Sequence, residues 1–187
     1  MPLPVAHGLL GVSIFLIGDS ENPKWQKWKH YLLCAFLAIS PDFDYILNFF
    51  PILGGGWHHG FTHSFGFAFV LGAIICNITN ERNLKHFLIY SSVISSHPVL
   101  DYLFTKSHGV ELFYPFSNQR FKLDLFDFLD YSWRNSTFNE SLFTLFKICF
   151  IEFLAFTPII LLILFLRRKS ITSHELRERA NQSNLRL

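Results

Sequence analysis

The sequence predicts an all-α membrane protein, a polytopic bundle of about five helices with an irregular segment over residues 106–140. Half of its 187 residues are hydrophobic, 23 are phenylalanine and only 16% are charged. The apolar residues form long blocks that end in charge clusters, without the 3.6-residue or alternating period of elements in a soluble protein. We therefore expect one membrane-embedded domain over residues 1–169 and a polar tail over residues 170–187.

Five apolar blocks are the candidate membrane helices, at about residues 3–18, 30–50, 61–79, 86–105 and 141–166. Each approaches the ~20 residues that cross the hydrocarbon core, although the first is short. The first block lacks a preceding Lys or Arg and a small-residue cleavage site before Asp19, so we expect a retained helix and not a signal peptide. The last is the clearest span, although it contains Lys147 and Glu152. Beyond it we expect a frayed end, in which Ser173 could cap a short helix.

Basic residues predict the orientation of the chain in the membrane. They gather between blocks one and two, between blocks three and four, and after block five, at Lys24, Lys27, Lys29, Arg82, Lys85, Arg167, Arg168 and Lys169. With five spans these places share one face, which the positive-inside rule assigns to the cytoplasm. We therefore expect a cytoplasmic C-terminus, with the N-terminus and the 106–140 segment on the outer side.

Cysteine usage and net charge exclude several classes of protein. Cys34, Cys76 and Cys149 are far apart and lie inside apolar blocks, which favours small core residues over a disulfide framework or a cysteine zinc site. The formal net charge is only +2, and no basic run is interleaved with aromatic residues. We therefore expect no nucleic-acid partner.

Ionisable side chains interrupt four of the apolar blocks, each time toward the predicted outer side. They are His7, Asp42, Asp44, His58, His59, His63, His97 and Asp101. Such groups cost several kcal/mol in a membrane span unless they are paired or liganded. Carboxylates gathered with imidazoles need a cation, and a nitrogen and oxygen donor set without thiolate favours one or two divalent ions, zinc first and manganese second.

The spacing of these residues supports a shared site unevenly. His97 and Asp101 are four apart, so a helix places them on one face. His59 and His63 have the same spacing, whereas His58 could join His63 if a helix begins near Gly60.

Asp42 and Asp44 are two apart and follow Pro41, so both can face one site only from an irregular turn. Each group also has a structural explanation. His7 could make an interhelical hydrogen bond, an aspartate could cap a helix, His58 or His59 could be an interfacial polar group, and the His97 and Asp101 pair could be a self-contained hydrogen bond.

Five segments together resemble a known family. They are "AHG", "PDFD", "HHGFTHS", "SSHPVLD" and "GVELFYPFSNQRFKLDLFDFLD", in this order, between residue 5 and about residue 131. They resemble the bacterial LexA-regulated, inner-membrane metal-dependent hydrolases. The most specific elements are the runs from Gly60 to Ser64 and from Tyr114 to Ser117.

The resemblance implies a helical protein of the bacterial inner membrane with a hydrolytic metal site, distantly similar to zinc-dependent phospholipases C. It carries metal-ligand or base roles onto His7, Asp42, Asp44, His58, His63, His97 and Asp101. The chain departs from the family at His59, where arginine is common. Histidine is only partly charged near neutral pH, so it is a weaker anion clamp.

The expected function is metal-dependent hydrolysis of a phosphoester, such as a phospholipid headgroup, at the outer interface. Two zinc ions would bring +4 against −3 from Asp42, Asp44 and Asp101, which favours a small or lipid-linked anionic substrate. Asp44 is the preferred base, and His59 is expected to contact the substrate.

Neighbouring polar residues are expected to assist this site. Thr62 and Ser64 could contact the substrate or only cap a helix. In the 106–140 segment Arg120 and Lys122 could attract phosphate headgroups and membrane lipids, while Asp124, Asp127 and Asp130 are expected to belong to a structural lid.

Two other functions remain open from the sequence. A proton- or metal-coupled transporter also uses buried His and Asp, but it should show an internal repeat with ligands near the bilayer midplane, and no repeat is present. A non-catalytic membrane scaffold would bind no metal.

Overall fold

The structure, a computed structural model, describes residues 4–19, 28–49, 58–105, 108–123, 125 and 138–184. These residues form five α-helices and two 3-10 segments, and no strand occurs among them apart from an isolated bridge between Val110 and Phe121. The all-α prediction with about five helices is confirmed. The elements are α1 (Pro4–Gly18), α2 (Trp28–Ile39), η2 (Ser40–Phe49), η4 (Phe61–His63), α3 (Phe65–Ile78), α4 (Leu84–Phe104) and α5 (Phe138–Asn184).

Local sequence signals set several of these helix ends. α2 stops at Ile39 and becomes a 3-10 segment, because proline at position 41 disfavours α conformation in the residue before it. Ser64 caps α3 by accepting a hydrogen bond from the backbone N–H of Phe67 at 3.1 Å. Asn83 caps α4 in the same way, from the N–H of His86 at 2.9 Å. The chain therefore enters α3 and α4 at defined points.

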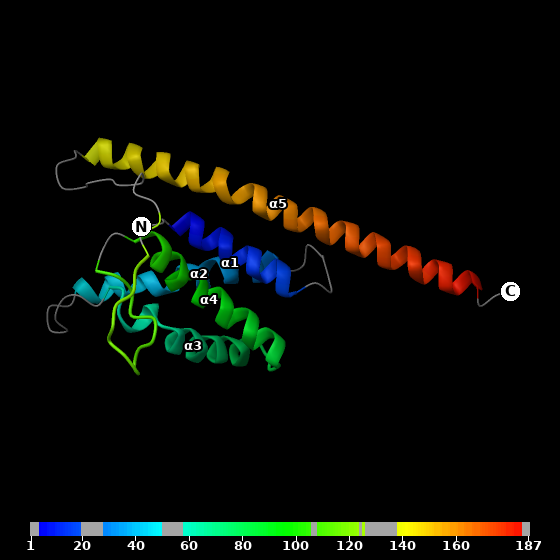
Figure 1. The fold of residues 1–187 in the computed structure, drawn as a ribbon, viewed down its shortest axis with the longest axis horizontal. Coiled ribbons are helices and arrows are strands. Elements are labelled where there is room, and N and C mark those ends of the chain that lie inside the picture. Colours follow the sequence, from blue (N-terminus) through cyan, green and yellow to red (C-terminus); the bar gives the residue numbers. More distant parts are fainter. Residues whose placement is uncertain are drawn as a thin grey trace.

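Helices α1 to α4 pack together with successive helices running in opposite directions. The start of α1, the end of α2, the start of α3 and the end of α4 therefore lie at the same end of the bundle. α1 lies against α2, α4 and α5, and α3 lies against α4 (Figure 1). Their shared core contains Phe15, Leu37, Tyr90, Val93 and Ile94. Cys34 and Cys76 are buried in the same core and Cys149 is half-buried, all three as free thiols, which agrees with the expectation of space-filling cysteines.

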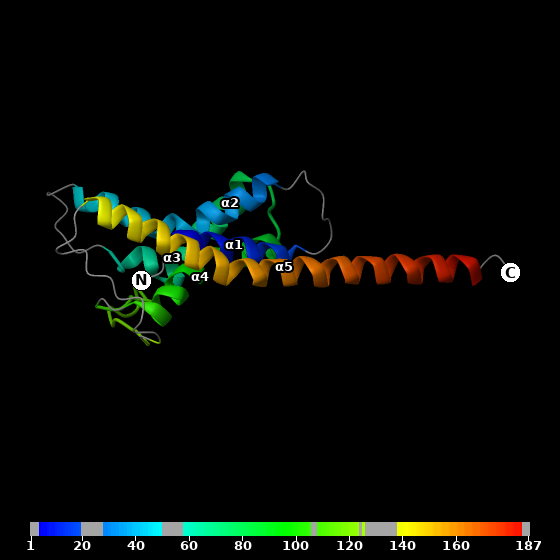
Figure 2. The ribbon, with the colours of Figure 1, turned by 90° about the horizontal axis from the view of Figure 1, so that it is seen from above.

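Helix α5 is the long element that runs past the bundle (Figure 2). Its segment Leu142–Leu166, with mean hydropathy 2.6, is the one helical stretch among the described residues that is long and apolar enough to cross a membrane. Five such spans were expected. α2 has 12 residues and α3 has 14, so at ~1.5 Å per residue each falls short of a ~30 Å hydrocarbon core.

The C-terminal part of α5 differs from the expected frayed end. The helix continues without interruption from the apolar span to Asn184, across the predicted boundary at residue 170. Ser173 therefore lies inside a helix and does not begin one. Glu, Leu, Arg and Ala dominate residues 175–180, and these residues have high helix propensity. The irregular 106–140 segment ends earlier than expected, because α5 begins at Phe138.

Candidate metal centre

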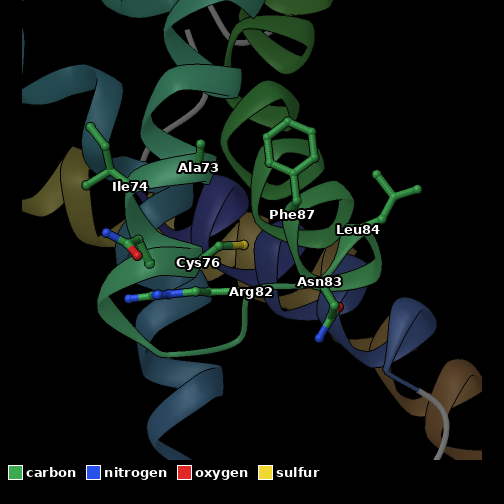
Figure 3. A pocket seen from close by; sticks show the side chains of 8 residues that line it. Ala73, Ile74, Cys76, Arg82, Asn83, Leu84 and Phe87 are labelled. Atoms are coloured by element: carbon green, nitrogen blue, oxygen red, sulfur yellow. The ribbon is translucent and has the colours of Figure 1, made fainter.

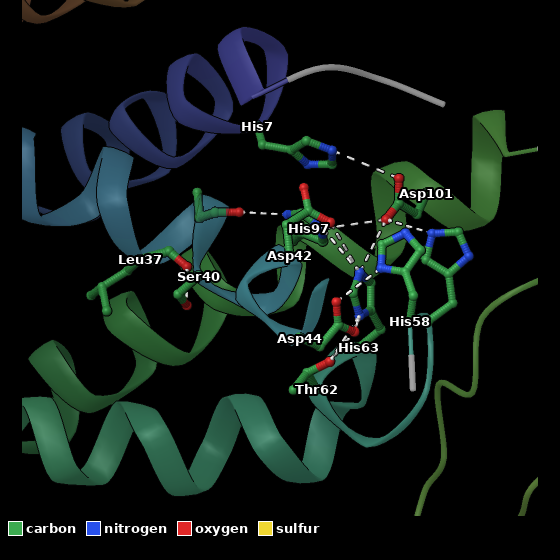
Figure 4. A network of polar contacts seen from close by, with 12 residues as sticks. His7, Leu37, Ser40, Asp42, Asp44, His58, Thr62, His63, His97 and Asp101 are labelled. Carbon is green, nitrogen blue, oxygen red and sulfur yellow. Dashed lines mark hydrogen bonds and ion pairs between the residues drawn. The ribbon is translucent and has the colours of Figure 1, made fainter. Parts of the chain in front are cut away.

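The ionisable residues predicted from sequence meet at one end of the four-helix bundle (Figure 4). α1 contributes His7 from its first turns, η2 contributes Asp42 and Asp44, and α4 contributes His97 and Asp101 near its end. His58 and His59 lie in the turn before η4, and His63 is the last residue of η4. Residues from distant parts of the chain thus converge because successive helices run in opposite directions.

Four donor atoms form the centre of this cluster. Asp42, His63, His97 and Asp101 each offer one ligand atom, and all four atoms lie within 4.8 Å of one another. The Nε2 atom of His97 is 3.3 Å from Asp42 Oδ1 and 3.3 Å from Asp101 Oδ2. The Nε2 atom of His63 is 3.5 Å from each of the same two oxygens. The two Nε2 atoms are 3.2 Å apart.

These separations suit a shared cation. Four donors placed tetrahedrally at ~2.0–2.1 Å from one zinc ion lie about 3.3–3.4 Å from each other. Asp101 and the rings of His63 and His97 are fully buried, and within the described residues no hydrogen bond reaches either oxygen of Asp101 or Oδ1 of Asp42. Buried carboxylate oxygens without donors are costly. The donor set therefore fits a divalent ion.

Hydrogen bonds on the far side of each imidazole orient its Nε2 atom toward the cluster. His97 Nδ1 lies 2.7 Å from the backbone oxygen of Ala38, so this nitrogen donates and Nε2 keeps its lone pair. His63 Nδ1 lies 3.0 Å from Thr62 Oγ1 and 3.3 Å from Asp44 Oδ2. Outer partners of this kind usually fix the tautomer of metal-binding histidines.

Asp42 and Asp44 stand on opposite sides of the His63 ring. Asp42 faces Nε2, whereas Asp44 faces Nδ1 and stands outside the four-atom group. Both oxygens of Asp44 are engaged, Oδ1 with His58 Nδ1 at 2.9 Å and Oδ2 with the Thr62 hydroxyl at 2.8 Å. The 3-10 segment makes this possible, as the irregular turn expected after Pro41. The structure thus gives different surroundings to two carboxylates that were both expected among the metal ligands.

Three further histidines surround the centre. His7 stacks on His97 with ring centroids 3.8 Å apart, and its Nε2 atom is 3.7 Å from Asp101 Oδ1. His59 Nε2 is 3.7 Å from Asp101 Oδ2. His58, His59 and His63 form a second group of potential ligands that overlaps the first at His63.

The helical spacings expected in this region were partly right. His97 and Asp101 share one face of α4 as predicted. The i,i+4 helical relation expected for His59 and His63 is wrong, because His59 has a positive φ of 64° in a turn and the 3-10 segment begins only after Gly60. The turn still directs His59 into the cluster.

Burial and neighbouring charges shift the pKa values of His59 and His63, which both lie outside the α-helices, in opposite directions. Burial lowers the pKa of His59 to about 3. Burial also acts to lower the pKa of His63, but the nearby carboxylates of Asp101, Asp42 and Asp44 outweigh it and raise this pKa to about 10. His59 is therefore a neutral donor at pH 7, whereas His63 holds a proton where a cation could bind.

Two of the other residues expected near the site have partners within the fold. The Ser64 hydroxyl caps α3, as its alternative explanation proposed. Arg120 pairs with Glu111, with Nη2 2.9 Å from Oε1, and Lys122 is exposed. Asp124, Asp127 and Asp130, expected in a lid, lie outside the described residues. Glu152 was expected only as a charged residue within an apolar span, with no role at the site.

A separate cavity of about 680 Å³ lies between the end of α3 and the start of α4 (Figure 3). Cys76, Asn77, Arg82, Asn83 and Phe87 are among the residues that line it. This cavity is at the opposite end of these helices from His63 and Asp101. The clustered donors, and not the cavity, therefore mark the candidate site.

Comparison with known proteins places the chain in a family. Residues 1–171 match the profile of the YdjM inner membrane protein family. The chain belongs to the YdjM inner membrane protein family. The inner membrane protein YbcI of Escherichia coli is 34% identical over 129 residues, which cover 65% of this chain and 72% of the relative. No solved structure shows a significant match to this chain.

Membership in the YdjM family agrees with the inner-membrane location expected from the sequence. It extends over α1 to α4, the cluster and the apolar span of α5. The names of the family and of YbcI state a location and no reaction.

Proposed function

We propose that this YdjM-family protein is a membrane-bound, metal-dependent hydrolase of phosphoesters, with phospholipid headgroups or other lipid-linked anions as the substrate class. The observation that carries the proposal is the buried group of Asp42, His63, His97 and Asp101. In this group the two Nε2 atoms lie 3.2 Å from each other and 3.3–3.5 Å from the facing oxygens of the two carboxylates. Groups that are expensive to bury are retained where they perform a function.

Asp42, His63, His97 and Asp101 would hold the ion, zinc in preference to manganese because two of the four donors are imidazoles. A bound divalent ion supplies Lewis acidity and a water that loses its proton near neutral pH. The chain's own residues keep the ligands in place. Ala38 and Asp44 orient His97 and His63 from behind.

The proton carrier in this proposal is His58, with Asp44 as its partner. The sequence favoured Asp44 itself as the base, but both of its oxygens already accept hydrogen bonds or face imidazole nitrogens. His58 Nδ1 faces Asp44, and within the described residues its Nε2 atom has no hydrogen-bond partner. A carboxylate on Nδ1 leaves Nε2 to accept and return a proton.

An anionic substrate requires a site with positive charge. One divalent ion would only balance Asp42 and Asp101, and His59 is neutral because burial lowers its pKa to about 3. A second ion near His7 and His59, whose Nε2 atoms are each 3.7 Å from an oxygen of Asp101, would leave the cluster slightly positive against its three carboxylates. We therefore propose a site that attracts phosphate after it has bound two ions.

The proposed topology is multi-pass, with the site toward the outer face and the C-terminus in the cytoplasm. The outer surfaces of α2 and α3 support membrane burial beyond α5, since Leu32, Phe36, Val70 and Ile78 are each more than half exposed. Apolar surface of this extent favours lipid contact.

Metal analysis and an activity assay on detergent-purified protein test the proposal. We expect about one or two zinc equivalents per chain and hydrolysis of chromogenic phosphomonoesters or phosphodiesters. His97→Ala should lose both, whereas His86→Ala, at the other end of α4, should keep both. Equal activity in the wild type and His97→Ala would refute the hydrolase. Metal movement across reconstituted vesicles without hydrolysis would instead identify a transporter, and a protein without metal would indicate a scaffold.

A further inference from the structure

Glu152 is a buried carboxylate on α5, whose apolar segment is almost entirely exposed at the surface of the described structure. Only 6% of the most apolar window of α5 is buried inside the protein, yet Glu152 is 7% exposed. Its neighbours Phe153 and Leu154 are about half exposed. An acidic side chain at such a position costs several kcal/mol unless a partner within the protein compensates it.

A hydrogen-bond partner of Glu152 lies at the beginning of α1. The backbone N–H of Ala6 donates a buried hydrogen bond to Glu152 Oε2, with 3.1 Å between the two atoms. α1 begins at Pro4, so Ala6 is among the first residues, whose N–H groups have no acceptor within their own helix. A carboxylate at this end also faces the positive end of the helix dipole. α5 thereby caps α1 from outside.

The capped residue adjoins a member of the metal centre. Ala6 precedes His7, whose ring stacks on His97 and whose Nε2 atom is 3.7 Å from Asp101 Oδ1. Within the described residues, neither nitrogen of His7 has a hydrogen-bond partner. Unlike His63 and His97, His7 has no outer partner on its ring in the described part of the chain, so the backbone of the first turn of α1 is what we expect to set its position.

We propose that Glu152 is a positioning residue that fixes the first turn of α1 and thereby holds His7 against His97 and Asp101. The spanning helix then forms part of the site without contributing a ligand. The effect of Glu152 on metal affinity rests on the proposed function, whereas its effect on the position of His7 does not.

The positional effect can be measured on metal-free protein. We expect Glu152→Leu to speed amide exchange in the first turn of α1 on the order of tenfold, through loss of a charge-assisted hydrogen bond. His7 should also become reactive toward diethylpyrocarbonate, which modifies accessible imidazoles. Glu152→Gln should leave His7 unreactive toward this reagent, because the amide oxygen of the glutamine still accepts the hydrogen bond from the backbone N–H of Ala6. Phe153→Leu is the matched control and should match the wild type.

A double-mutant cycle on zinc affinity then distinguishes positioning from general stabilisation. We expect Glu152→Leu and His7→Ala each to weaken zinc binding about tenfold, and the double variant to bind no more weakly than His7→Ala alone. If the double variant loses zinc affinity by the product of the two single losses, the proposal is overturned. Unchanged amide exchange in the first turn of α1 together with unchanged His7 reactivity in Glu152→Leu would also overturn it. If the wild type binds no zinc, the proposed function fails and the metal-free measurements alone decide the role of Glu152.

Discussion

His63 and His97 face each other through their Nε2 atoms at 3.2 Å, and both rings are fully buried. Two such nitrogens repel unless one carries a proton or both bind a common cation. Asp42 and Asp101 flank the pair on either side at 3.3–3.5 Å. A single proton would let the two nitrogens hydrogen-bond to each other but would leave the facing oxygens of Asp42 and Asp101 without a partner, whereas a divalent ion between the four atoms would satisfy all of them.

Removal of the Asp101 charge should abolish high-affinity metal binding. Asp101→Asn keeps the size of the side chain but replaces one carboxylate oxygen with an amide nitrogen, so we expect zinc affinity to fall on the order of 100-fold or more. Competition with a chromogenic chelator measures this change. Glu81→Gln, a carboxylate change at the opposite end of the bundle, serves as the control. Unchanged zinc affinity in Asp101→Asn would exclude the ligand assignment.

Asp44 should behave as an orienting residue. Asp44→Ala removes the partner of His63 Nδ1 and His58 Nδ1 but none of the four central donors. We expect a loss of zinc affinity of about 10–100-fold with unchanged stoichiometry. Metal content after dialysis at fixed free zinc tests this. If zinc is lost from Asp44→Ala as completely as from Asp101→Asn, Asp44 is a direct ligand.

Metal affinity should rise with pH. The metal-free cluster raises the pKa of His63 to about 10, so at neutral pH an incoming ion must displace this proton. Each displaced proton weakens apparent binding by about tenfold per unit of decreasing pH. Calorimetric titration in two buffers of different ionisation enthalpy should detect about one proton released per ion at this position. Constant affinity between about pH 6 and pH 8 would show that His63 carries no proton there.

Gly11 should be essential to the packing of α1 on α2. A Cβ atom at this position would lie 2.6 Å from Ala38 Cβ and 2.7 Å from the Cys34 carbonyl oxygen. Gly11→Ala should therefore lower the free energy of unfolding by about 1–3 kcal/mol. Gly8→Ala, where the nearest atom is 3.6 Å away, is the matched control and should be tolerated. Thermal unfolding in detergent compares the two, and equal stability would contradict this close approach.

The C-terminus should lie in the cytoplasm. The basic residues after the α5 span favour this side. The site residues lie at the start of α1 and near the end of α4, away from the loop that joins α3 to α4. A green fluorescent protein fused after Leu187 should fluoresce, because the fluorescent reporter folds in the cytoplasm and folds poorly after export. A dark fluorescent fusion, together with an active alkaline phosphatase fused at the same point, would show that the C-terminus lies on the outer side.

The sequence by itself determined the all-α class, the residues of the cluster and the approximate positions of the five helices, but not where α2 and α5 end. Long apolar blocks, capping residues and the i,i+4 spacing of His97 and Asp101 are local signals, and local hydrogen bonding and periodicity convert them into helices. The cost of polar groups in apolar blocks indicated which side chains had to meet.

Only the tertiary structure decided how these side chains divide their roles. Asp42 and Asp44 have nearly identical sequence contexts, but the 3-10 segment places one among the central donors and the other behind His63. Glu152 acquires its partner 146 positions away along the chain. Such contacts depend on how α1, α4 and α5 pack together, and no local pattern of residues encodes that arrangement.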